Sequence, residues 1–145
     1  MRQYKVEKEF DYKGYKCVVI GQEIGHRCGY IGVDKNNKCY GKDYDELYGI
    51  DVHGGLTYAG ETYENYPCED KLWWFGFDCA HLGDGKDFDL IKELADKDYY
   101  DYETRVQSMF SHLNNGEIRS VDYCISECKK VVDQLIELNK DSSLK

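Results

Sequence analysis

Three of the four histidines in this chain stand close to glycine. His26 follows a glycine, His53 precedes Gly54 and Gly55, and His81 lies two residues before another glycine. Imidazole nitrogens bind metals and act as general acids or bases near neutral pH. These three histidines are therefore the first candidates for metal binding or acid/base catalysis.

Three carboxylates, Asp51, Asp78 and Asp84, accompany these histidines. If the strands that carry them are neighbours, the set suits a metal site or an acid/base site. The spacing matches neither the HExxH motif nor an EF-hand loop. We therefore expect no metal and no cofactor, and a small metal-dependent hydrolase using these His and Asp side chains is kept as an alternative.

Residues 25–33, GHRCGYIGV, contain three glycines, which is unusual for a plain strand. Glycine inside a strand often marks the close approach of a ligand or of another backbone. One interpretation is that the glycines make room for aromatic rings. The other is that His26 and Arg27 lie at the mouth of a pocket floored by bare backbone.

The second interpretation predicts a ligand-binding cleft, because glycine exposes backbone N–H groups and aromatic faces can stack a base or a sugar. The predicted ligand-binding residues are His26, Arg27, His53, Gly54, Gly55, Trp74, Asp78, His81 and Asp84.

The net charge of −9 opposes direct binding to nucleic acid or to an anionic membrane. The glycine pairs also lack the lysine of a phosphate-binding loop. A strongly anionic ligand would need Arg27, Lys16 and Lys71 to be gathered in one place.

The seven cysteines form no Cys-x-x-Cys pair, so the zinc-ribbon and thioredoxin signatures are absent. Their number is odd, and most are expected to be small buried hydrophobic residues. A structural zinc site assembled from dispersed Cys and His is the other alternative.

The N-terminal part of the chain has the patterns of β-structure. Residues 4–21 predict a hairpin, and residues 50–59 alternate as one strand or as two half-strands broken at Gly54-Gly55. Residues 72–85 predict a buried strand followed by a polar turn. Trp73 and Trp74 then point to opposite faces of the sheet.

The C-terminal part has helical patterns. A helix is predicted near Phe88–Ala95, residues 96–104 read as a loop or exposed turn, and a short helix over 106–113 is stopped by Asn114-Asn115-Gly116. Ser120 caps the last helix, of about 20 residues. Its apolar stripe consists of Val121, Cys124, Ile125, Cys128, Val132, Leu135 and Leu138.

These elements predict one α+β domain over residues 1–145, β-rich over 4–80 and helical over 86–140. About five antiparallel strands form a sheet that packs against the long C-terminal amphipathic helix. The chain contains neither a signal peptide nor a long apolar run, so we expect a protein of the bacterial cytoplasm.

Three blocks, GHRCGYIGV (25–33), VHGGLTYAG (52–60) and WWFGFDCAHLGD (73–84), resemble a family of small bacterial and phage proteins, as does the helix from IRSVDYCISECKKVVDQL (118–135). The family has no characterised activity that could be carried over. The resemblance implies a single soluble domain and a phage or mobile-element setting.

The leading functional expectation is a non-enzymatic binding protein. It would hold a small polar or nucleotide-like ligand, or a host protein, in a cleft lined by the three blocks, and the resemblance adds the blocking of a host defence component. The alternatives are the metal-dependent hydrolase and an acidic protein–protein inhibitor acting through the 96–103 run. Homo-oligomerisation is left open.

Overall fold

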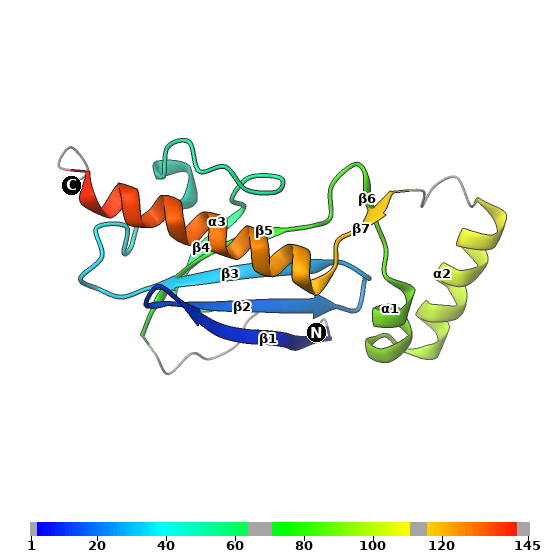
Figure 1. The fold of residues 1–145 in the computed structure, drawn as a ribbon. Coiled ribbons are helices and arrows are strands. Elements are labelled where there is room, and N and C mark those ends of the chain that lie inside the picture. The colour runs from blue at the N-terminus through cyan, green and yellow to red at the C-terminus, as the bar shows by residue number, and fades with distance from the viewer. Residues whose placement is uncertain (1–2, 64–70, 111–115, 142–145) are drawn as a thin grey trace.

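A computed structural model describes residues 3–63, 71–110 and 116–141 of the chain. Figure 1 shows an antiparallel sheet with a long helix, α3 (Val121–Lys140), lying across one face. The five strands of this sheet stand in the order β1 (Tyr4–Tyr12), β2 (Tyr15–Gln22), β3 (Arg27–Val33), β5 (Trp73–Asp78) and β4 (Tyr58–Gly60). The predicted α+β class, sheet and C-terminal helix are confirmed.

The remaining elements are short or peripheral. A 3₁₀ turn, η1 (Tyr44–Glu46), lies before β4, while α1 (Phe88–Leu94) and α2 (Lys97–Met109) follow the two-residue strand β6 (Asp84–Gly85). β6 pairs in parallel with β7 (Glu117–Ile118), which leads into α3. In the described part of the chain, no helix is long and apolar enough to cross a membrane.

The predicted hairpin over 4–21 is present as β1 and β2. Its turn residues, Lys13 and Gly14, both have positive φ, at 50° and 84°. Two consecutive positive φ values give the turn whose twist matches that of the flanking strands.

The sheet separates two apolar clusters, because alternate residues of each strand point to opposite faces. Cys17, Val19, Ile31 and Phe75 belong to the larger cluster, which also contains the buried residues of α3. Val18, Ile20, Tyr30 and Trp74 form the cluster of the other face. Trp73 packs against the larger cluster, so the prediction that the two tryptophans divide between the faces is confirmed.

The glycines of β3 make room for aromatic rings, as the first interpretation of block 25–33 holds. A Cβ on Gly29 would lie 2.4 Å from the Phe77 ring and 2.8 Å from the Cys128 sulfur. A Cβ on Gly32 would lie 2.7 Å from Leu72 and 3.1 Å from the Trp74 ring.

Two predictions about elements are wrong. Residues 50–57 form no strand, because Gly54 and Gly55 both turn through positive φ (68° and 79°), and β4 covers Tyr58–Gly60 alone. Residues 97–104 belong to helix α2 rather than to a loop. None of the residues of this helix is buried, and it begins where the Asp96 side chain accepts a hydrogen bond from the backbone N–H of Tyr99.

The predicted helix over 106–113 is the end of α2, which stops at Met109. Leu113 and Asn114-Asn115 lie outside the described residues, as do residues 64–70 of the predicted 60–71 loop. The helix predicted near residues 88–95 and the cap at Ser120 are both confirmed.

The contact between Gly29 and Phe77 predicts a coupled pair of substitutions. Gly29→Ala should lower the free energy of unfolding by about 1–3 kcal/mol, because the core must shift to admit a methyl group. Phe77→Leu should also destabilise the protein, but in the double variant the smaller side chain gives the methyl group space. Urea unfolding of all four proteins measures this, and simple additivity of the two losses would contradict it.

Candidate functional site

The polar centre of the molecule is the carboxylate of Asp84, whose side chain is 1% exposed. It accepts hydrogen bonds from His53 Nε2 at 2.9 Å, Arg119 Nε at 2.8 Å and the backbone N–H of His81 at 3.0 Å. Three segments far apart in the chain therefore meet at one carboxylate.

The pairing of β6 with β7 brings Asp84 and Arg119 together. A Cβ on Gly85 would lie 2.5 Å from the Gly116 carbonyl oxygen, and a Cβ on Gly116 would lie 2.6 Å from the Gly83 oxygen. The two backbones can cross this closely because both positions lack a side chain. Arg119 then stands directly before the cap of α3.

His53 is held on three sides. Its Nε2 faces Asp84, its Nδ1 lies 2.8 Å from the Tyr123 hydroxyl, and its backbone N–H donates to the buried Glu127 at 2.8 Å. An ionised carboxylate only accepts, so Nε2 carries a proton, and in the neutral ring Nδ1 accepts from Tyr123. These bonds anchor loop 52–57 to the first turns of α3.

The environment favours the charged form of Asp84. Burial alone would raise the pKa of this carboxyl, but the hydrogen bonds from His53, Arg119 and the backbone of His81 outweigh it, and the pKa lies below its ordinary value. Asp84 is therefore a charged structural centre.

His81 lies directly against Gly54: a Cβ there would be 2.2 Å from His81 Nε2. This nitrogen is 3.1 Å from Asp78 Oδ1, but the alignment is not that of a hydrogen bond. Asp78 instead accepts from the Thr57 hydroxyl at 2.9 Å and the Ala80 N–H at 3.1 Å. The rings of His53 and His81 are 6.0 Å apart.

His26 faces the same group of carboxylates. Burial lowers the pKa of its imidazole and the charge of Lys86 lowers it further, against a hydrogen bond with the Cys79 backbone and the charges of Asp84 and Asp78. Its Nδ1 is buried and has no hydrogen-bond partner among the described residues. The structure thus gathers His26, His53, Gly54, Asp78, His81 and Asp84 from the predicted set.

Arg27 does not lie at the mouth of a pocket, and this expectation is wrong. Its side chain is 9% exposed and donates to Glu7 at 2.8 Å, to Asp87 at 2.9 Å and to the carbonyl of Arg119 at 3.2 Å. A register shift in β1 between Val6 and Lys8 lies at Glu7, and such a bulge re-aims a side chain.

Trp74 and Gly55 also stand apart from this group. Trp74 is fully buried in the cluster of the opposite face, where its ring packs on Tyr63 at a centroid distance of 4.7 Å. Gly55 shapes the turn through its positive φ, and a Cβ added there meets nothing within 4 Å.

A hollow of about 310 Å³ opens on the sheet face opposite α3, beside Asp78. Its described lining is Gln22, Ile24, Cys28, Tyr30, Thr57, Tyr58, Gly76, Phe77, Asp78 and Ala80. All three blocks contribute to this lining. We refer to it as the Asp78 hollow.

The sequence predictions missed the tyrosines of this hollow. In the register, Tyr30 and Tyr58 both pair with Gly76. The Tyr30 ring lies over this glycine, and the two ring centroids are 5.7 Å apart. The alternation of side chains already places Cys28 and Tyr30 on one face of their strand, but the pairing partners could not be read from it.

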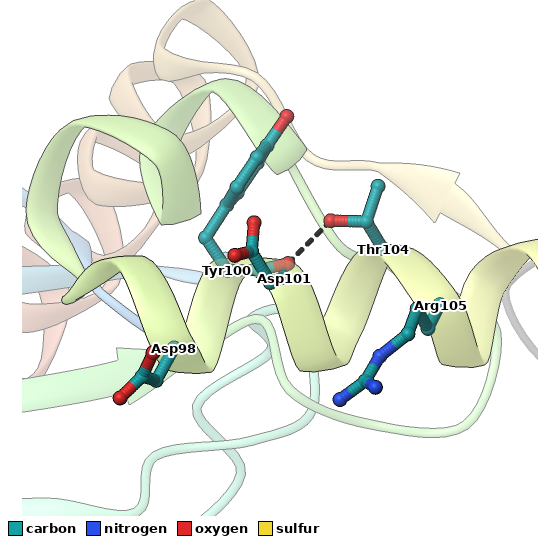
Figure 2. Close-up of a pocket in the computed structure, with 5 residues that line it drawn as sticks. All are labelled: Asp98, Tyr100, Asp101, Thr104 and Arg105. Atoms are coloured by element: carbon teal, nitrogen blue, oxygen red, sulfur yellow. Dashed lines mark hydrogen bonds between the residues drawn. The ribbon is translucent and has the colours of Figure 1, made fainter.

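A second hollow, of about 620 Å³, lies along α2 (Figure 2). Asp98, Tyr100, Asp101, Thr104 and Arg105 line it, and the Thr104 hydroxyl donates to the Tyr100 carbonyl. None of the residues of α2 is buried. No buried side chain of α2 therefore forms a floor for this hollow.

The described cysteines, Cys17, Cys28, Cys39, Cys79, Cys124 and Cys128, are all buried free thiols, while Cys68 lies outside the described residues. Cys79 and Cys124 lie with their sulfurs 3.8 Å apart, and their contact and burial raise the pKa of Cys79 far above its ordinary value. In the described ranges, no group of three or more His, Cys, Asp and Glu side chains is placed to hold a metal ion.

No protein-family model matches this chain, and neither does any curated protein or solved structure. The fold and the site define an α+β sheet-and-helix domain whose polar segments join at one buried carboxylate. The resemblance of the three blocks to bacterial and phage proteins stays a prediction.

The geometry of Asp84 predicts a large effect of Asp84→Asn. The free energy of unfolding at neutral pH should fall by about 2–3 kcal/mol, because His53 and Arg119 lose a buried charged acceptor. Since the folded pKa is depressed, this stabilisation is present above the ordinary value of 3.8 and is lost as the pH falls through the folded pKa. The difference between the two proteins should therefore close in acid, as measured by urea unfolding across pH.

Glu117→Gln is the matched control, because Glu117 also accepts from Arg119 but is 75% exposed. Its cost should stay below about 1 kcal/mol at every pH. Equal losses for the two variants would show that burial of Asp84 is not the cause.

Proposed function

We propose that this protein is a non-enzymatic binding protein that holds a small polar ligand in the Asp78 hollow. The observation that carries the proposal is the lining: Tyr30, Thr57 and Asp78 each come from a different one of the three glycine-bearing blocks. Tyr30 and Thr57 are 27 positions apart in the chain and Thr57 and Asp78 are 21 apart, yet all three share one concave surface. Concave surfaces with a few convergent polar groups are the usual form of ligand sites.

The chemistry of the lining specifies the class of ligand. Asp78 offers a carboxylate that only accepts hydrogen bonds, while the half-buried Tyr58 and the edge of Tyr30, whose ring is stacked on Tyr63, add aromatic surface. None of the described lining residues is a lysine or an arginine. The ligand is therefore neutral or cationic, with N–H or O–H donors beside a flat or apolar part, such as an amino-bearing nucleobase or an amine.

A phosphate group does not fit inside this hollow. Two of the cations that an anionic ligand would need are engaged elsewhere: Arg27 with Glu7 and Asp87, and Lys16 with Glu9 at 2.9 Å. A nucleotide would bind through its base, with its phosphates outside. The volume, near the lower end for small-molecule sites, suits one base or one sugar.

The Asp84 centre supports this hollow from behind. His53 anchors loop 52–57 to α3. Thr57, at the end of this loop, donates a hydrogen bond to Asp78. The backbone N–H of His81 donates to Asp84, and the turn that contains this bond begins directly after Asp78. The histidines thus act as positioning residues for the walls.

The proposal extends to a purpose, the sequestration of a host signal or the blocking of a host defence component. The support for this extension is the resemblance of the three blocks to phage and bacterial proteins. The ligand class stands independently of it.

Thermal unfolding with a panel of free bases, nucleosides, amino sugars and amines at millimolar concentration tests the proposal. At least one compound should raise the Tm by about 2–4 °C, because a ligand that binds the folded state alone stabilises it. Asp78→Asn should abolish the shift and Thr57→Val should reduce it. Asp98→Asn, the same charge change on α2, should leave it unchanged.

Two results would overturn the proposal. One is a flat Tm across the whole panel. The other is a shift that Asp78→Asn leaves intact, which would place the ligand elsewhere.

A further inference from the structure

The C-terminal half of α3 has a groove that lies away from the Asp78 hollow. Loop 48–51 lies against the helix there, because the Gln134 side chain accepts from the Asp51 N–H at 2.7 Å and donates to the Asp51 carbonyl at 2.8 Å. The space between the loop and the helix has a volume of about 450 Å³. The part of α3 that lines it is the red end of the helix in Figure 1. We call this space the α3 groove; its described lining is Tyr48, Gly49, Ile50, Asp133, Gln134, Glu137, Leu138 and Asp141.

The middle of the groove is apolar. Ile50 and Leu138 are half-buried and pack against the larger core cluster. Tyr48 stands beside them with 93% of its surface exposed, so its ring has little intramolecular cover. An exposed tyrosine next to aliphatic side chains is the type of anchor found at protein interfaces.

The rim of the groove is acidic along its α3 side. Asp133, Glu137 and Asp141 are spaced by four residues and so follow one side of α3. The segments 43–51 and 133–141 together carry seven carboxylates and one lysine, Lys140. Lys13, Lys38, Lys42 and Lys130 reach these segments from outside, so the acidic character is strongest at the three carboxylates that line the helix side of the groove.

The cations already present on the rim are weakly held. Lys13 pairs with Asp133 at 2.9 Å and Lys140 with Glu137 at 3.5 Å, and all four side chains are about half exposed or more. Exposed pairs of this kind contribute little to stability. Another cation can therefore replace them at small cost.

We propose that the α3 groove docks a basic, amphipathic segment of a partner protein. An apolar side chain of the segment would lie between Tyr48, Ile50 and Leu138, and its Lys or Arg side chains would meet Glu137 and Asp133. A second copy of this chain is a poor occupant, because two surfaces of the same high negative charge repel each other. This inference is independent of ligand binding in the Asp78 hollow.

The hollow on α2 provides a contrast within the same molecule. Figure 2 shows Arg105 on the same helix as the carboxylates of Asp98 and Asp101, and Asp101 pairs with Lys97 at 2.7 Å. That surface combines acid with base and lacks buried apolar residues. It is the natural charge-matched control for the α3 groove.

The test uses the full chain and a fluorescent peptide of about 14 residues built from Leu and Lys at helical spacing. A scrambled peptide of the same composition is the second probe, and anisotropy titrations at low and moderate salt give Kd. The patterned peptide should bind at least about tenfold more tightly than the scrambled one, because only its apolar side can enter the groove.

Three variants locate the site. Tyr48→Ala, and separately the pair Asp133→Asn with Glu137→Gln, should each weaken binding of the patterned peptide by about tenfold. The pair Asp98→Asn with Asp101→Asn removes the same charge from α2 and should leave Kd unchanged. All of these positions are exposed or partly exposed, so the fold should survive, and urea unfolding checks this.

Four results would overturn the proposal. Equal affinity for the two peptides would mean general attraction of polycations. Equal loss of peptide affinity in the double variant of α2 and in the double variant of the groove would also mean general attraction of polycations. The absence of binding below millimolar concentration would remove the site, and a dimer in sedimentation that Tyr48→Ala dissociates would assign the groove to a second copy.

Discussion

The ionised carboxylate of Asp84, buried at the end of the sheet, is the constraint on which the polar half of the molecule depends. It binds His53 of loop 52–57, the backbone of His81 in the turn after β5, and Arg119 before α3. Arg119 also accepts at its carbonyl from Arg27, whose guanidinium joins Glu7 of β1 to Asp87 at the start of α1. Two buried ion networks therefore meet at one residue.

Such networks contribute specificity of arrangement more than net stability, since desolvation of the charges offsets much of their attraction. The free energy that holds the sheet together comes from its two apolar clusters, with α3 on one face and the tyrosine-rich cluster around Trp74 on the other. The ion networks decide instead how the loops beyond the strands are placed. The position of Asp78 relative to Tyr30 and Tyr58 follows from that placement.

Periodicity predicted the elements whose stability comes from apolar packing. The apolar run of residues 16–20 and the stripe of α3 both follow from burial, and both are present. The first part of helix α2 was missed because none of its residues is buried. Residue type alone singled out His53 and Asp84, but Tyr123 and Glu127 were missed, because their polar role depends on which face of α3 meets loop 52–57. Arg27 was misplaced because its partners, Glu7 and Asp87, are 20 and 60 residues away.

The adjacent tryptophans of β5 have a spectroscopic consequence. Trp73 donates from its indole nitrogen to the Lys42 carbonyl at 2.8 Å on the α3 side, whereas Trp74 is fully buried against Tyr63 on the other side. The two indoles therefore fluoresce from different surroundings although they are neighbours in sequence. Trp74 shares its cluster with Tyr30 and Tyr58 of the Asp78 hollow, and Trp73 lies 6.1 Å from Tyr40. Replacing either indole by phenylalanine leaves a protein whose emission reports one face of the sheet.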